Sequence, residues 1–226
     1  MAVMYPKNQG LYESATEQDN CGIGFVAHIK GKKSHDIVRR GLEVLERMEH
    51  RGAEGADNKT GDGAGIMLQM PDGFFRKLNP ELPAPGKYGS GLVFLPRDKA
   101  ALKLCLSILE KNIQAEGQKL LFWRDVPVDS TQLGEIARAS EPLIRQVFIG
   151  GEPEQSSDTL ERKLFVIRKQ SERQVRESGN QTAEFYFYIP SLSTRTFVYK
   201  GMLMPDQVRK YFLDLGDKRL EAAIAL

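Results

Sequence analysis

The stretch Asn20-Cys21-Gly22-Ile23-Gly24-Phe25 places a cysteine at the start of a short apolar segment near the beginning of the chain. Apolar residues alternate over residues 22–29, a pattern typical of a strand in which every second side chain shares a face. The glycines beside Cys21 weaken a strand but let a ligand or another backbone come close. The stretch therefore predicts a strand that presents a nucleophilic thiol, with Cys21 as the candidate catalytic residue.

A cysteine reacts as its thiolate, and the pKa of a free thiol is about 8.5, so Cys21 needs a base or a positive field. Its own α-amino group, with a pKa of about 7.7 to 8.0 in model compounds, could act as that base once residues 1–20 were removed. Residues 1–20 are polar and lack the periodicity of a packed element. This pattern predicts a detachable leader, and an ordinary frayed N-terminus is the alternative that it leaves open.

Composition and charge exclude several classes of protein. The 226 residues, 41% of them hydrophobic, are enough to bury a full core as one large domain or two small ones. Basic and acidic residues number 32 and 30 and are interleaved, which argues against a nucleic-acid or membrane partner. Residues 1–10 do not resemble a signal peptide, and no run of about 18 apolar residues could span a bilayer. We expect a cytoplasmic protein.

The two cysteines are too few for a disulfide framework, and neither lies in a spacing that binds metal, so no metal site is expected. Cys105 falls on the apolar side of a predicted helix that Asp98 caps and Gly117 ends. A buried, unreactive thiol is the expectation there.

Strands and helices are predicted in mixed order, without regular β-α-β alternation, which favours an α+β fold. Helices are expected from Ser34 to Met48, after Asp98, over residues 158–177 and over residues 206–213. Strands are expected over residues 66–70, 88–95, 119–126 and 144–149, and residues 185–189 and 196–199 are expected to form a hairpin about Pro190–Thr194.

A glycine-rich stretch, Lys59-Thr60-Gly61-Asp62-Gly63-Ala64-Gly65, precedes the predicted strand at residues 66–70. It predicts a tight loop that feeds a buried strand. As a phosphate cradle it is weak, because it lacks the lysine and Ser/Thr of a P-loop and leads into a strand. His50 and Arg51 follow the first predicted helix, where basic groups also occur simply because the helix dipole favours them.

Three motifs together, Cys21 to Phe25, His50-Arg51-Gly52 and residues 59–66, resemble the opening of the glutaminase domain of the glutamate synthase large subunit. That domain is a class II glutamine amidotransferase of the N-terminal-nucleophile hydrolase superfamily. The similarity continues through segments 125–128, 133–135, 142–146, 161–169 and 191–202.

The resemblance implies a four-layer αββα sandwich, with residues 1–20 as a propeptide and residues 21–226 as the N-terminal part of the glutaminase domain. It also implies that the sandwich is incomplete at its C-terminal side. The family's Arg-Phe-Ser-Thr and Asn-Gly-Glu segments, which supply substrate-binding and oxyanion-hole groups, do not occur in this sequence.

The activity implied by the resemblance is hydrolysis of L-glutamine to glutamate and ammonia, with Cys21 as nucleophile and Arg51 positioning the nucleophile region. This fragment by itself is expected to be inactive and to hold no cofactor. In the intact synthase, ammonia would pass to 2-oxoglutarate at a distant FMN and iron–sulfur centre supplied by NADPH, NADH or ferredoxin. The remainder of the synthase is the implied partner, and a small subunit is allowed for.

Two other hypotheses stay open at this point. The chain could be a non-catalytic folding or subunit-contact module whose cysteine is merely packed. It could also be another class II amidotransferase, which would share the cysteine and the His-Arg-Gly motif. That reading does not account for segments 161–169 and 191–202.

Overall fold

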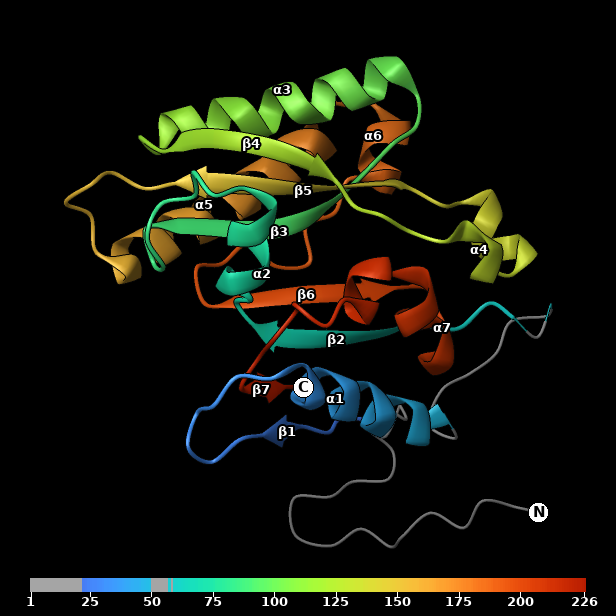
Figure 1. Cartoon of the computed structure of the whole chain (residues 1–226). Coiled ribbons are helices and arrows are strands. Elements are labelled where there is room, and N and C mark those ends of the chain that lie inside the picture. The colour runs from blue at the N-terminus through green and yellow to red at the C-terminus, as the bar shows by residue number, and fades with distance from the viewer. Residues whose placement is uncertain (1–21, 50–56, 58) are drawn as a thin grey trace, which may run out of the picture.

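The computed structural model describes residues 22–49, 57 and 59–226 of the chain. Strands and helices alternate irregularly along these residues, and all pairs of neighbouring strands are antiparallel, so the predicted α+β class is confirmed (Figure 1). The elements are β1 (Val26–Ala27), α1 (His35–Arg47), β2 (Ala64–Gln69), α2 (Asp72–Leu78), β3 (Tyr88–Leu95), α3 (Lys99–Ala115), β4 (Lys119–Asp125), α4 (Glu135–Ala139), β5 (Leu143–Gly150), α5 (Ser157–Glu177), α6 (Gln181–Tyr186), β6 (Thr196–Gly201), α7 (Pro205–Tyr211) and β7 (Ile224–Ala225).

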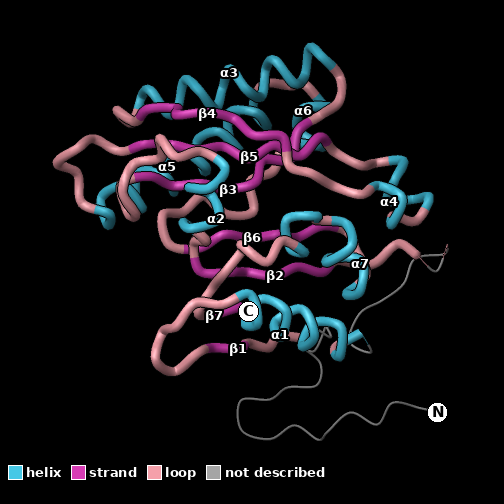
Figure 2. The backbone as a smooth tube through the Cα atoms, in the orientation of Figure 1, coloured by secondary structure: helices cyan, strands magenta, loops and turns pink. Residues whose placement is uncertain are grey.

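One sheet has the strand order β3-β5-β4, and helices α3, α5 and α6 cover one of its faces (Figures 1 and 2). Side chains of the central strand β5 alternate between two cores. Val147 and Ile149 pack with the helices, while Ile144 and Phe148 enter the core on the opposite side. Because both faces are covered, the strand is apolar along most of its length.

The other sheet has the order β1-β7-β2-β6, and α1 packs on it. Gly41 of α1 lies so close to this sheet that a Cβ there would come within 2.7 Å of the Ala225 side chain. The absence of a side chain at Gly41 lets the helix approach the sheet. The two sheets are connected by isolated bridges that join β3 to the segment before β6, Ser90 with Ser193 and Phe94 with Tyr188.

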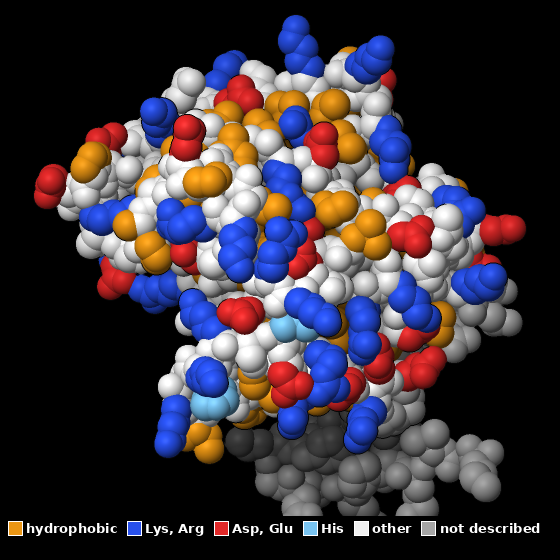
Figure 3. Space-filling view, viewed as in Figure 1, with side chains coloured by type: hydrophobic (Ala, Val, Ile, Leu, Met, Phe, Trp, Pro, Cys, Tyr) orange, Lys and Arg blue, Asp and Glu red, His pale blue; other side chains and the backbone are white. Residues whose placement is uncertain are grey.

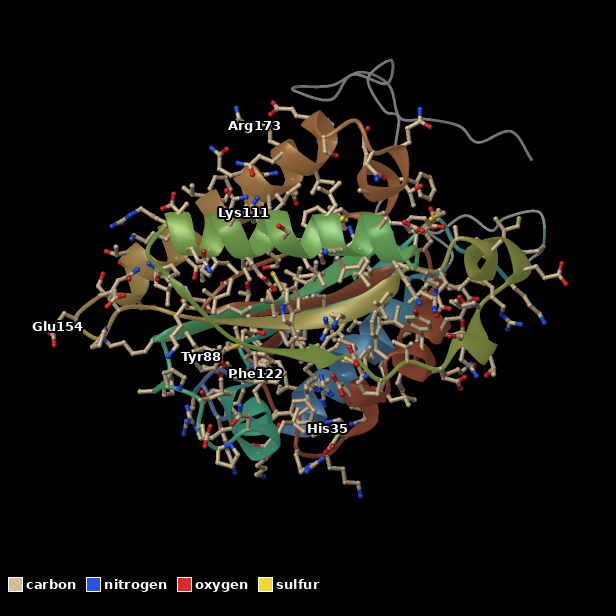
Figure 4. All side chains as sticks on the ribbon, turned by 90° about the horizontal axis from the view of Figure 1, so that it is seen from above. His35, Tyr88, Lys111, Phe122, Glu154 and Arg173 are labelled. Carbon is tan, nitrogen blue, oxygen red and sulfur yellow. The ribbon has the colours of Figure 1, made fainter. Side chains whose placement is uncertain are left out.

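An aromatic cluster fills the core that the two sheets share. Tyr88 and Phe122, which lie close together in Figure 4, both contact Phe148 of β5, with ring centroids 6.2 and 4.2 Å from it. Phe75 of α2 lies between Phe148 and Phe197 of β6 at 5.3 and 5.0 Å. Edge-to-face and offset contacts of this kind stabilise a core beyond the area that they bury.

Most elements predicted from the sequence are confirmed within a residue or two, but the aromatic segment before β6 is not. Residues 185–189 were expected to pair with residues 196–199 as a hairpin. Instead Gln181–Tyr186 forms α6, whose N-terminus is capped by the Asn180 side chain, which accepts a hydrogen bond from Ala183 N at 2.9 Å. β6 pairs with β2 over six residues, so a long-range partner outweighs the local strand propensity.

The first predicted strand is also much shorter than expected, since only Val26 and Ala27 of residues 22–29 form a strand. It pairs with the two-residue strand β7 at the edge of its sheet. On the face of the molecule in Figure 3, positive and negative side chains are interspersed, in keeping with the balanced charge of the sequence.

Candidate active site

The predicted nucleophile Cys21 and the predicted positioning residue Arg51 lie outside the described residues, as does His50. Between Cys21 and β1, the described residue Gly24 lies against Val44 of α1. A Cβ at Gly24 would come within 2.6 Å of the Val44 side chain. His28 has a structural role in the turn that follows β1. Its Nδ1 accepts hydrogen bonds from the backbone N–H groups of Lys30 and Lys32, both at 3.3 Å.

The other cysteine, Cys105, is fully buried in α3 among the apolar side chains that face the β3-β5-β4 sheet. Burial raises the pKa of the Cys105 thiol to about 11, so the group stays protonated and unreactive at neutral pH. The prediction of an inert core thiol is confirmed. Cys21 is therefore the remaining candidate for a nucleophilic cysteine in this sequence.

The glycine-rich segment that leads into β2 is held on the first turn of α4. The Asp57 carboxylate accepts hydrogen bonds from Thr60 N at 2.8 Å, from the Thr60 hydroxyl at 2.7 Å and from Ile136 N at 3.2 Å. The Thr60 hydroxyl oxygen in turn accepts from Ala137 N at 3.3 Å. The hydrogen bond from the Thr60 hydroxyl is the largest cause that lowers the pKa of Asp57 below its ordinary value. The carboxylate is thus ionised at any physiological pH and fixes this segment to α4.

The glycines of the segment serve close packing and not phosphate binding. A Cβ on Gly61 would lie 2.3 Å from the carbonyl oxygen of Leu203, so the two backbones touch at this point. A Cβ on Gly65 would lie 2.6 Å from the carbonyl oxygen of Tyr199 on the neighbouring strand β6. The weak reading of residues 61–65 as a phosphate cradle is not supported by this packing.

A cleft of about 480 Å³ lies where this segment, the end of β6 and the chain between α4 and β5 meet. Its size falls within the range of small-molecule sites. Its walls are largely apolar and include the exposed side chains of Phe185, Tyr188 and Met202. The charged groups on its walls are Asp62, Glu141 and Lys200, and the described residues contribute no thiol to it.

Two of the charged groups of the cleft, Glu141 and Lys200, already interact with neighbouring side chains of the protein. Glu141 accepts hydrogen bonds from the hydroxyls of Tyr211 and Ser130 at 2.9 and 2.6 Å and pairs with Arg97 at 2.8 Å, so its role is structural. The ammonium group of Lys200 lies 5.4 Å from the centre of the Tyr188 ring, a cation–π distance. The cleft can therefore bind a small molecule with an apolar part.

The two late segments of the sequence that resemble the glutaminase family, residues 161–169 and 191–202, are in direct contact. The Glu161 carboxylate of α5 accepts hydrogen bonds from the Ser193 hydroxyl at 2.6 Å and from the backbone N–H and hydroxyl of Thr194, both at 2.7 Å. Arg168 donates to the carbonyl oxygen of Pro190 at 2.9 Å. These contacts fix the chain that enters β6.

The described ranges contain no group of three or more His, Cys, Asp or Glu side chains that could hold a metal ion. No helix within those same ranges is both long and apolar enough to cross a membrane. The sequence analysis did not single out Asp57 and Thr60 as contacts of α4, although the glycine-rich motif pointed to their region.

Comparison with known proteins agrees with the resemblance seen in the motifs. A family model described as glutamine amidotransferases class-II matches residues 21–226, so the match begins at Cys21. The chain is 46% identical over 224 residues to the NADPH glutamate synthase large chain of Bacillus subtilis, covering 98% of this chain and 14% of that protein. It is 38% identical over 229 residues to a ferredoxin-dependent glutamate synthase of Arabidopsis thaliana, covering 100% of this chain and 14% of that protein.

A third relative, the NADH glutamate synthase of Schizosaccharomyces pombe, is 41% identical over 231 residues, which cover 98% of this chain and 11% of that protein. The chain thus spans about 14% or less of the length of these curated relatives. With a match over nearly all its residues, the chain belongs to the class II glutamine amidotransferases and corresponds to the amidotransferase domain at the N-terminal end of glutamate synthase large chains.

Proposed function

We propose that the chain is the glutaminase part of a glutamate synthase and that Cys21 hydrolyses the side-chain amide of L-glutamine. The observation that carries this proposal is the family match, which opens on Cys21 and extends to residue 226. The burial of Cys105 supports it, because the second thiol of the sequence is unreactive at neutral pH.

Residues 1–20 are removed in this mechanism, so that Cys21 gains a free α-amino group. That amine has a pKa near neutrality and accepts the thiol proton, directly or through one water molecule. The polar composition of residues 1–20 and their position before the family match support their role as a leader.

The thiolate then attacks the amide carbon of glutamine, and the π electrons of the carbonyl move onto its oxygen. When the tetrahedral intermediate collapses, the C–N bond breaks and the nitrogen leaves as ammonia, taking the proton from the ammonium group of Cys21. Water next attacks the glutamyl thioester, the C–S bond breaks, and glutamate and the free thiol are formed. No oxidant or reductant takes part in these steps.

Both tetrahedral intermediates carry an oxyanion that needs preorganised hydrogen-bond donors, each typically worth about 3 to 4 kcal/mol. Arg51 has the role of positioning the nucleophile region. The donors expected from the family's Asn-Gly-Glu segment are not in this sequence, so we expect the 226-residue chain alone to release little glutamate.

An N-terminal-nucleophile hydrolase would carry two β-sheets between two helical layers. Two antiparallel sheets flanked by helices support this architecture. On β2 and β6, the side chains of Ile66, Leu68, Phe197 and Tyr199 are buried, whereas those of Met67 and Val198 between them are half-buried. One face of this sheet is therefore less covered than the other.

The redox groups of a glutamate synthase do not fit this part of the chain. An iron–sulfur cluster is usually held by four cysteine thiolates, and the sequence has two cysteines, one of them in the core. Gly61 and Gly65 are packed against protein backbone, which leaves no room for an FMN phosphate beside them. FMN, the cluster and the contacts with NADPH, NADH or ferredoxin belong, in this proposal, to the remainder of a cytoplasmic synthase and to a small subunit where one exists.

The proposal is tested on the intact protein that carries this domain. Its mass should show Cys21 as the first residue, and a glutamine analogue with an electrophilic carbon in place of the amide should add once, to Cys21. Cys21→Ala should abolish both the labelling and the release of glutamate.

Cys105→Ala is the matched control, and it should leave labelling of Cys21 in place because the Cys105 thiol is buried and protonated. Retention of Met1 in protein that hydrolyses glutamine would overturn the role of the amino group. Preferential labelling of Cys105 would overturn the choice of nucleophile.

A further inference from the structure

The cleft of about 480 Å³ at the end of β6 is walled on one side by aromatic rings. Phe94 of β3 stacks on Tyr188, with ring centroids 6.0 Å apart and ring planes 15° from parallel. The backbones of these two residues are joined by two hydrogen bonds, at 2.9 and 3.2 Å. Phe185 and Tyr186 at the end of α6 meet edge to face, with centroids 4.9 Å apart. We call these four residues the ring wall, and secondary structure holds it in place.

Large apolar side chains of the cleft stay exposed to solvent. Phe185 is 73% exposed, Met202 59% and Tyr188 44%. Exposed apolar surface gathered in a hollow marks a binding site, because covering it removes apolar area from water. An aromatic ligand suits these walls best, since ring–ring and sulfur–ring contacts add to the effect of the area that is buried.

Two side chains of opposite charge, Asp62 and Lys200, line the same cleft. Neither has an ion-pair partner among the described residues, whereas Glu141, the third charged group there, already has one. Lys200 of β6 lies opposite Gly65 of β2, and Asp62 precedes Gly65 by three residues, which is about 10 Å of extended chain. The Lys200 ammonium group lies against the ring wall, 5.4 Å from the centre of one ring. The cleft therefore offers a cation and an anion beside an aromatic surface.

We propose that this cleft is a binding site for an aromatic α-amino acid. The ring of the ligand lies against the ring wall and Met202, its carboxylate meets the Lys200 ammonium group, and its ammonium group meets the Asp62 carboxylate. A ligand with a single charge leaves one of the two side chains without a partner, and ionic hydrogen bonds are the strong ones. The inference does not rest on the function proposed above, because it uses neither Cys21 nor Arg51.

The test is a ligand-observed NMR titration of the intact protein that carries this domain, with L-phenylalanine as the probe. A ligand of this size should bind with a dissociation constant on the order of 1 mM. Hydrocinnamate lacks the ammonium group of phenylalanine, and phenethylamine lacks its carboxylate. Each should bind about threefold to tenfold more weakly than phenylalanine, because one charged contact is lost.

Two variants that remove one charge each should give a crossed pattern. Lys200→Met should weaken binding of phenylalanine and of hydrocinnamate by about threefold to tenfold, without weakening binding of phenethylamine. Asp62→Asn should weaken binding of phenylalanine and of phenethylamine by a similar factor, without weakening binding of hydrocinnamate. This pattern arises only where each charge of the ligand meets its own side chain.

The ring wall is tested with a matched pair of phenylalanine variants. Phe185→Ala should weaken binding of all three probes by about threefold to tenfold, because it removes part of the wall. Phe165→Ala is the control: Phe165 is 55% exposed on α5, outside the cleft, and its ring lies 5.7 Å from the Arg168 guanidinium group. Phe165→Ala should leave all three affinities unchanged.

Several results would overturn the inference. Phenylalanine that shows no saturable binding in the millimolar range overturns it, as when another protein segment covers the cleft. Equal effects of Phe165→Ala and Phe185→Ala, or equal weakening of all three probes by Lys200→Met, do the same. Displacement of phenylalanine by an equal concentration of L-glutamine would show that the cleft takes the substrate instead.

The binding measurements need no turnover, so the two proposals fail separately. A protein that hydrolyses glutamine but does not bind phenylalanine refutes this inference alone. A protein that binds phenylalanine with the crossed pattern but releases no glutamate refutes only the proposed function.

Discussion

A buried ion pair that links the two sheets gives the sharpest prediction about stability. Asp214, in the 3-10 turn Leu213–Gly216, is 4% exposed and accepts two hydrogen bonds from the Arg124 guanidinium of β4, at 2.6 and 2.8 Å. The hydroxyl of Tyr199 on β6 donates to the same carboxylate at 3.0 Å. Arg124 also donates to the amide oxygen of Gln146 on β5 at 3.0 Å. One carboxylate therefore connects β4 with β6.

Asp214→Ala should lower the free energy of unfolding by about 3 to 5 kcal/mol, because it leaves the Arg124 charge unpaired with its side chain only 17% exposed. That is a large part of the roughly 5 to 15 kcal/mol that a domain has. Tyr199→Phe removes one hydrogen bond to the same carboxylate and should cost about 1 kcal/mol. Urea unfolding at equilibrium, followed by fluorescence, measures both values.

The double variant Arg124→Met with Asp214→Ala should be less destabilised than Asp214→Ala alone, because no buried charge is then left without a partner. Glu177→Ala provides the control at an exposed pair on α5, where Arg173 and Glu177 have side chains 61% and 62% exposed. There the loss should stay below about 0.5 kcal/mol. The reasoning is refuted if Asp214→Ala lowers the free energy of unfolding by less than about 1 kcal/mol. It is also refuted if the double variant loses as much stability as Asp214→Ala and Arg124→Met lose together as single variants.

Three further measurements test local features of the fold. Gly61→Ala should lower the free energy of unfolding by about 1 to 3 kcal/mol, because its Cβ would lie 2.3 Å from a carbonyl oxygen. Gly73→Ala is the control: its Cβ would have nothing within 4 Å, so it should stabilise α2 by up to about 1 kcal/mol. Urea unfolding measures both changes. Asp98→Ala should lower the free energy of unfolding by about 1 kcal/mol, because the Asp98 carboxylate caps α3 by accepting a hydrogen bond from Ala101 N at 2.8 Å. Ser34→Ala should lower it less, because the Ser34 side chain makes no cap hydrogen bond to α1. Equal losses in the two variants would contradict this reasoning. Burial raises the pKa of Cys105 to about 11, so its contribution to stability is complete below the pKa of the unfolded thiol, near 8.5, and is lost as pH rises toward 11. Cys105→Ala should therefore flatten the alkaline loss of stability between pH 8 and 11 by about 2 to 3 kcal/mol, and an unchanged slope would show that the thiol is not buried in solution.

The sequence predicts most of the local structure, because helices and strands leave periodic patterns over short distances. The apolar row about Cys105 predicts both helix α3 and the burial of its thiol, and both are confirmed. Strands were also predicted at residues 88–95 and 144–149, and the structure buries side chains on both faces of each. The roles of Cys21 and Arg51, which the motifs predict, stay predictions.

Pairing between distant segments leaves no comparable pattern. The aromatic run at residues 185–188 has the composition of a strand, but a cap at Asn180 begins a helix and β6 pairs with β2. Of the strand predicted over residues 22–29, only Val26 and Ala27 form a strand, and they pair with the two-residue strand β7. Propensity is a weak guide at such places, since the energy of a strand comes mainly from its neighbours.

By itself, the sequence determined the α+β class, the boundaries of the long helices and central strands, and the membership in a glutamine amidotransferase family. Only the tertiary structure decided which strands pair, that Asp214 connects β4 with β6, and that Glu161 of α5 holds the chain that enters β6. The physical reason is the distance along the chain over which each interaction acts. Local propensity and hydrophobic periodicity act over a few neighbouring residues, whereas a buried polar contact is specified by side chains that meet only after the chain has folded.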